Sequence, residues 1–144
     1  MPDFPIIDAH VHLFDPATLP YAWLGGVPKI NKAHGTADLD RLAAPVVVDG
    51  IVFVEVDVDD PRYLDEARWV EGLAEADPRI RALVAGMPME QGTAIEGDIA
   101  EYARLPHARG VRRLMQKHAD EPGWSVRPDF VAAVRLLPKY NLSF

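Results

Sequence analysis

Apolar and polar positions change their spacing several times along the chain, and the changes predict strands and helices in turn. Short β-rich runs occupy residues 5–11, 49–58, 79–89 and 109–115. Each run is followed, at a varying distance, by a stretch of helical character, at residues 36–44, 59–78, 94–105 and 127–140. Strand and helix alternate through four rounds, which predicts a parallel α/β architecture with right-handed crossovers.

The second strand and the helix after it carry the clearest patterns. Residues 49–58 are apolar on both faces and become acidic only from Glu55 onward, which is typical of a buried parallel strand. Residues 59–78 carry an apolar stripe at helical spacing, and Pro61 is expected in the first turn of that helix.

Residues 141–144 begin a fifth strand, and two architectures fit this order of elements. One is an open, doubly wound sheet, and the other is part of a closed (β/α)8 barrel. In both architectures, ligands bind at the carboxyl ends of the strands. We therefore expect the functional side chains at those ends.

The end of the first strand carries the sharpest chemical signal. Asp8, His10 and His12 in "PIIDAHVHLF" share one parity, so a strand would align them on one face. Two imidazoles at this spacing suit adjacent coordination positions of one divalent metal ion, with Asp8 deeper as an acceptor for a ring N–H. Ordinary polar residues at a strand end can share this spacing, which identifies no third ligand.

Polar side chains also mark the ends of the second and fourth strands. Glu55 is a candidate metal ligand or acceptor for substrate hydroxyls, although a solvated acid would have the same pattern. Arg112, facing a pocket, would hold a carboxylate or lactone oxygen in a forked contact. Trp23 and His118 lie in loops at the same end and are candidates for substrate binding. The alternatives are a tryptophan that covers the core and a solvated histidine.

Composition removes several classes of function. A net charge of −7 argues against binding to nucleic acids or to anionic membrane surfaces. The chain has no cysteine, so any metal must be bound by histidines and carboxylates. No apolar run is long enough to span a membrane, and the acidic start does not suit a signal peptide. We expect a cytoplasmic protein that acts on a small-molecule substrate.

Several stretches, taken together and in order, resemble the amidohydrolase-related family of the amidohydrolase 2 type. They are "IIDAHVHLFDP", "YAWL", "GIVFVEVD", "EARWVEGLAEADPRIRALVAG", "ARGVRRLMQ" and "WSVRPDFVAAVRLLPKYNLSF". The closest branch is the sugar-lactone and pyrone-dicarboxylate lactonases. The resemblance implies a (β/α)8 TIM barrel and hydrolysis of a lactone or amide by activated water. It also implies a divalent metal, most often zinc, although some lactonases of this branch act without one.

The resemblance assigns roles to particular residues. It implies catalytic roles for His10, His12 and Arg112, and metal binding by the two histidines. It implies substrate binding by Glu55 and Arg112, to which we add Trp23 and His118 as residues of the same end. The histidines of the family's fifth and sixth strands, and the eighth-strand aspartate that activates water, have no counterpart in this sequence.

The length limits what the chain is expected to do alone. A complete barrel needs about 200 residues or more, whereas this chain has 144. We expect residues 1–144 to form a single partial amidohydrolase-like domain, the N-terminal half of a TIM barrel with four βα units and the start of strand five. Truncation or fragmentation is the first explanation, and such a chain is expected to be inactive alone.

Open sheet edges and an uncovered inner face would expose apolar surface. We therefore expect either a homo-oligomer or a missing C-terminal half. The alternative to an enzyme is a non-catalytic half-barrel that self-associates or needs a partner segment. A third interpretation is a small open α/β binding domain, although no glycine-rich nucleotide motif is present.

Overall fold

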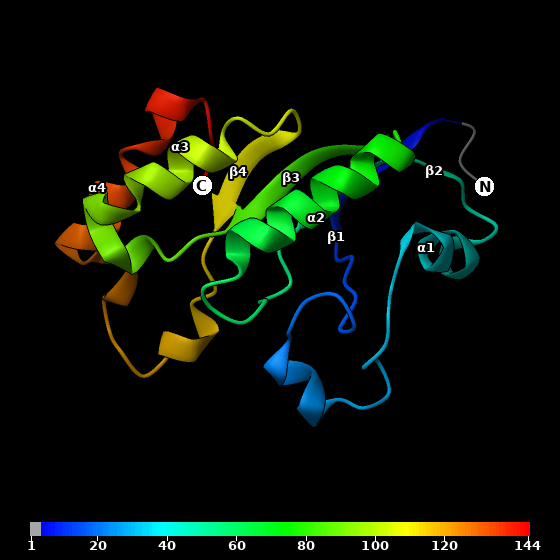
Figure 1. The fold of residues 1–144 in the computed structure, drawn as a ribbon, viewed down its shortest axis with the longest axis horizontal. Helices are drawn as coiled ribbons and strands as arrows, with labels where there is room; N and C mark the ends of the chain where they lie inside the picture. Colours follow the sequence, from blue (N-terminus) through cyan, green and yellow to red (C-terminus); the bar gives the residue numbers. More distant parts are fainter. Residues whose placement is uncertain (1–3) are drawn as a thin grey trace.

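A computed structural model describes residues 4–144. Four parallel strands lie side by side in chain order in one sheet (Figure 1): β1 (Ile6–Val11), β2 (Val48–Val54), β3 (Ile80–Gly86) and β4 (Ala108–Arg112). A doubly wound sheet reverses its strand order at a switch point, and this sheet does not. The order is therefore that of a segment of a barrel, and the four strands form an open, curved piece.

Helices follow the strands as the alternation predicts. The α-helices are α1 (Thr36–Ala43), α2 (Tyr63–Ala76), α3 (Glu96–Tyr102) and α4 (Pro128–Val134). Short 3-10 helices lie between them: η1 (Ala22–Gly26), η2 (Met89–Ile95), η3 (Gln116–His118), η4 (Trp124–Val126) and η5 (Leu137–Tyr140). In Figure 1, α2 crosses the sheet, α3 and α4 flank β4, and α1 lies beside the β1 side. The segments with η1 and η3 lie toward the carboxyl ends of the strands.

Two helices differ from the sequence prediction. The predicted helix 127–140 is divided into α4 and η5, because Pro138 has no N–H to donate and its ring blocks a continuous helix. Pro61 was expected in the first turn of its helix, and this is wrong, because α2 begins only at Tyr63. The preceding residue Asp59 is committed elsewhere: its carboxylate accepts the Ala22 N–H, 2.8 Å away.

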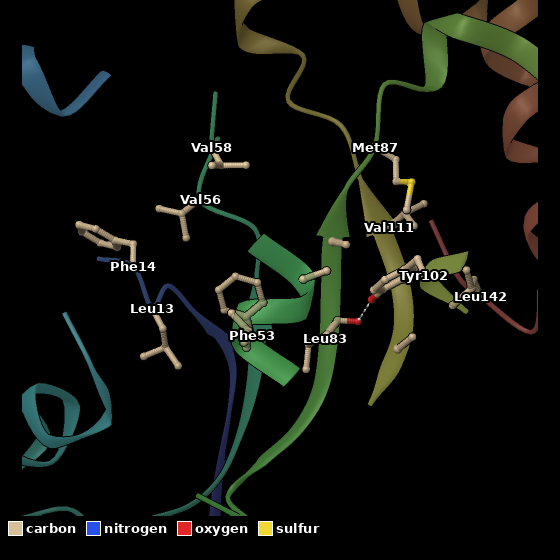
Figure 2. Close-up of a cluster of buried hydrophobic side chains, with 14 of the residues drawn as sticks. Leu13, Phe14, Phe53, Val56, Val58, Leu83, Met87, Tyr102, Val111 and Leu142 are labelled. Carbon is tan, nitrogen blue, oxygen red and sulfur yellow. Dashed lines mark hydrogen bonds between the residues drawn. The ribbon is translucent and has the colours of Figure 1, made fainter. Parts of the chain in front are cut away.

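An apolar cluster fills the space between the sheet and its helices. Figure 2 shows Phe53, Leu83, Met87 and Val111 from the strands and the segments after them, with Tyr102 from α3. All five are buried, and the Tyr102 hydroxyl donates to the Leu83 carbonyl at 2.6 Å. This cluster holds the helices on one face of the sheet.

The two edges of the sheet are different. Ser143 forms a parallel bridge to Gly110 beside β4, which is the start of the predicted fifth strand. On the other edge, β1 is uncovered on both faces: Ile7 is 54% exposed, and Ala9 and His10 are also exposed. Among the described residues, no further strand pairs with the outer side of β1.

Candidate functional site

The carboxyl ends of three strands bring His10, Glu55 and Arg112 together. The Arg112 Nη1–H donates to His10 Nε2 at 3.3 Å. The Arg112 Nε lies 2.9 Å from a Glu55 carboxylate oxygen, forming an ion pair in which the carboxylate is almost fully buried. Because β1, β2 and β4 run parallel, their ends meet at one edge of the sheet, and side chains from distant parts of the sequence converge there.

His12 lies next to this group. Its ring is 4.9 Å from that of His10, measured between centroids, and the two rings are nearly perpendicular. The Nδ1 of His12 lies 2.9 Å from the Val54 carbonyl oxygen. Since a carbonyl can only accept, Nδ1 carries the hydrogen, and the lone pair of the neutral ring is on Nε2.

Glu55 is held in place by the backbone around it. Its carboxylate accepts the Asp57 N–H at 2.6 Å, which closes a tight turn after β2. A Cβ added at Gly86 on β3 would lie 3.3 Å from that carboxylate, so the side chain lies directly over a glycine. Asp57 has a left-handed backbone (φ 56°), an uncommon conformation for a non-glycine residue. Its carboxylate pairs with Lys117 from the segment after β4.

A second buried carboxyl group lies behind Glu55, and the sequence analysis missed it. Glu66 of α2 is only 1% exposed, and both of its carboxyl oxygens lie 3.4 Å from the Val56 N–H. Burial, with a contribution from the nearby Glu55 charge, raises the pKa of Glu66 to about 8. The signal was present in the sequence, because Tyr63, Glu66 and Val70 share one helical stripe.

Tyr21 lies beside Glu66 in the core. Its hydroxyl is fully buried and has no well-formed hydrogen bond within the described part of the chain. Burial, and after it the Glu66 carboxyl, raise the pKa of the Tyr21 hydroxyl. The hydroxyl therefore stays protonated and available as a donor.

The other two predicted substrate residues have different surroundings. The indole N–H of Trp23 donates to the Val56 carbonyl at 2.9 Å, so Trp23 supports the segment that follows Glu55. His118 stacks on Trp124 at 3.8 Å between ring centroids, and its Nδ1 lies 2.7 Å from the Glu121 carboxylate. These contacts lead away from His10 and Arg112. Substrate binding by Trp23 and His118 stays a prediction.

A hollow of about 240 Å³ opens between β1 and α1. His10 and His12 form one wall of it, and His34, Asp38 and Leu42 form part of the other. The two predicted metal-binding histidines therefore border an open space and are not sealed in the core.

The donor set does not complete a zinc site. Zinc needs at least three protein ligands, and within residues 4–144 no three histidine or carboxylate side chains gather closely enough to hold a metal ion. The Nε2 of His10 already accepts a hydrogen bond from Arg112, which leaves the free Nε2 of His12 as the better donor. The described residues therefore fit part of a metal site at most. None of the described helices combines the length and apolar character needed to cross a bilayer.

Comparisons with known proteins add two kinds of relative. No protein-family model matches the chain. Uncharacterized protein y4mH of Sinorhizobium fredii is 27% identical over 161 residues, which cover 100% of this chain and 54% of that protein. L-fucono-1,5-lactonase of Burkholderia ambifaria is 29% identical over 141 residues, which cover 96% of this chain and 46% of that enzyme. The chain thus spans about half the length of the curated relatives that it matches.

Solved structures give the same picture of the fold. Amidohydrolase 2 from Bifidobacterium longum subsp. infantis matches with a TM-score of 0.70 and 24% identity, over 96% of this chain and 49% of that one. An amidohydrolase from Burkholderia multivorans with bound zinc matches with a TM-score of 0.73 and 24% identity, over 96% and 47%. The predicted resemblance to amidohydrolases of this type is confirmed, and the chain has the fold of about half of such a protein.

Proposed function

We propose that this chain supplies half of an active site that opens a lactone ring, such as that of a sugar lactone, with water. Its similarity to L-fucono-1,5-lactonase supports this substrate class. The observation that carries the proposal is the convergence of His10, Glu55 and Arg112 at the carboxyl end of the sheet. This is the end at which enzymes with parallel barrels carry out their chemistry.

Arg112 is the residue best placed to act on the lactone carbonyl. Its contacts to Glu55 and His10 hold the guanidinium plane in one orientation at the open face. When the oxygen of water bonds to the carbonyl carbon, negative charge develops on the carbonyl oxygen, and a fixed cation stabilises it. The ring C–O bond then breaks, and the released oxygen takes up a proton. The resemblance assigns the base that deprotonates water to an aspartate outside the matched segment.

His12 supplies the second element of the proposed site. Its Nδ1–H is fixed by the Val54 carbonyl, so the Nε2 lone pair can accept a hydrogen bond from a substrate hydroxyl or from water. Because the donor set is incomplete for zinc, no step of this mechanism depends on a metal.

The test is binding and turnover on the purified chain. L-Fucono-1,5-lactone and a sugar lactam, its stable isostere, are titrated while the side-chain NMR signals of the arginines and histidines are recorded, with and without zinc. We expect the signals of Arg112 and His10 to move and Arg112→Met to abolish binding. Arg104→Met, which removes an exposed arginine on α3's C-terminal flank, is the matched control. Where the lactone is turned over, we expect Arg112→Met to lower the rate about 100-fold or more. A folded chain whose Arg112 and His10 signals ignore both compounds would contradict the proposal.

A second candidate is a non-catalytic half-barrel that associates with itself or with a partner segment. Apolar side chains near the β1 edge are exposed: Phe4, Ile7, Leu42 and Val47. Such side chains favour association when they form a continuous surface. Light scattering would show a dimer or larger assembly that binds neither lactone nor lactam. A monomeric mass at every concentration would exclude self-association.

A further inference from the structure

The chain leaves the regular sheet after Glu55, and side chains take over the backbone hydrogen bonds there. The Val56 N–H faces the Glu66 carboxyl at 3.4 Å, and the Val56 carbonyl accepts the Trp23 indole N–H at 2.9 Å. The Asp57 N–H donates to Glu55 itself. Since the Glu55 carbonyl and the Val56 N–H belong to one peptide group, whatever fixes that group also fixes the direction of the Glu55 side chain.

Glu66 occupies an unusual position for a glutamate. It is buried in the core, and the titratable groups that face it are Tyr21 from the loop before η1 and Glu55 and Asp57 from the segment after β2. A charged carboxylate beside two other carboxylates is costly in such a place. With a pKa of about 8, Glu66 holds its proton at neutral pH, and Glu55 is then the charged carboxylate that pairs with Arg112.

We propose that Glu66, assisted by Tyr21, is a positioning residue that fixes the Val56 peptide and thereby holds the Glu55 carboxylate against Arg112. Its contribution to catalysis rests on the proposed lactone hydrolysis, whereas the coupling between Glu66 and Arg112 does not. When Glu66 loses its proton, a second negative charge appears behind Glu55, and the Val56 N–H binds an anion where it had faced a neutral carboxyl group. Both changes reach Arg112 through Glu55.

The coupling is measured on the whole 144-residue chain, labelled with ¹³C at the glutamate carboxyl and arginine guanidinium carbons. We expect the Glu66 carboxyl signal to titrate with a midpoint near pH 8. We expect the Arg112 guanidinium signal to move with the same midpoint. Glu66→Gln should abolish both transitions, and Arg112→Lys assigns the guanidinium signal. Glu75→Gln removes an exposed carboxylate from the same helix and should leave both transitions unchanged.

A second variant tests the role of Tyr21 and protects the experiment against misfolding of the first. The Tyr21 hydroxyl lowers the pKa of Glu66, so Tyr21→Phe should move both midpoints to higher pH. A stationary Arg112 signal while Glu66 titrates, or an Arg112 transition that survives Glu66→Gln, would overturn the proposal. So would unequal displacement of the two midpoints by Tyr21→Phe.

Failure of this inference can be told apart from failure of the proposed function. A chain that shows the coupled titration but neither binds nor hydrolyses lactones retains the positioning role and loses the lactonase function. A chain that binds lactones while Arg112 ignores Glu66 retains the function and loses the positioning role.

Discussion

The two edges of the sheet differ in how much of the molecule supports them. At the β4 edge, Ser143 exchanges backbone hydrogen bonds with the strand, accepting from Val111 at 2.9 Å and donating to Arg109 at 3.0 Å. Leu142 is buried beside it. At the β1 edge, the strand pairs only with β2, and Ile7 remains largely exposed.

This difference concerns function, because the candidate site extends over both regions. Arg112 and Glu55 lie on strands with covered neighbours, whereas His10 and His12 lie on or just after the open edge strand. An edge strand without a second neighbour opens at lower free energy than a central one. The part of the site that holds Glu55 is therefore the stable part, and the histidine pair depends on what covers β1.

The largest expected effect is electrostatic and lies inside the well-supported region. The folded-state pKa of Glu66 is about 8, above its usual 4.5, so the folded protein binds the proton more tightly than the unfolded chain. Stability should therefore be highest below about pH 4.5, fall as the pH rises, and level off above pH 8, by up to about 5 kcal/mol in all. Urea unfolding across this range measures it.

Glu66→Gln should remove most of that decline and make the protein more stable than the wild type at pH 8. Glu75→Gln, with the same loss of charge at an exposed position of α2, should retain the wild-type slope. Equal slopes in the wild type and Glu66→Gln would show that Glu66 is not protonated in the fold.

The next effect tests packing at the centre of the covered face. Phe53 on β2 is completely buried against the cluster in Figure 2. Phe53→Ala should lower the free energy of unfolding by about 3–5 kcal/mol, because it removes buried apolar surface and leaves a cavity. Denaturant unfolding at a fixed pH gives the value. A loss below about 1 kcal/mol would mean that the covered face is as loosely held as the β1 edge.

Much of this architecture follows from local sequence patterns. A strand that is apolar on both faces, such as 49–58, has to be buried on both sides, and this requirement predicted a parallel sheet. The start of α2 could not be predicted locally, because Asp59 is held by Ala22, 37 residues away in the sequence. Contacts at this separation leave no trace in a short window.

The same distinction applies to the site. His10, Glu55 and Arg112 could be predicted to meet because parallel strands end at one edge. Glu66 was overlooked because a glutamate in an amphipathic helix is ordinarily solvated, and only its phase on the stripe with Tyr63 and Val70 marks it as inward. The contacts of His118 with Trp124 and Glu121 depend on loop geometry, which the residue pattern does not define.

A smaller effect should come from the hydrogen bond that ties α3 to β3. Tyr102→Phe removes the hydroxyl that donates to the Leu83 carbonyl while keeping the buried ring. We expect a loss of about 1 kcal/mol, since one hydrogen bond disappears in a buried environment. Thermal unfolding compared with Tyr140→Phe, whose hydroxyl donates to Glu96 in a more accessible place, separates the effect of burial.

The smallest effect is expected at the open edge, and it is the direct counterpart of Phe53→Ala. Ile7 on β1 is 54% exposed, so Ile7→Ala removes little buried surface and should change the free energy of unfolding by no more than about 0.5 kcal/mol in the isolated chain. If a partner segment or a second copy covers β1 in solution, Ile7 is buried in that assembly and the same substitution becomes costly. Unfolding and light scattering on one sample then read together: a loss above about 2 kcal/mol, with a fall in mass, would mean that the two edges differ only while the partner is absent.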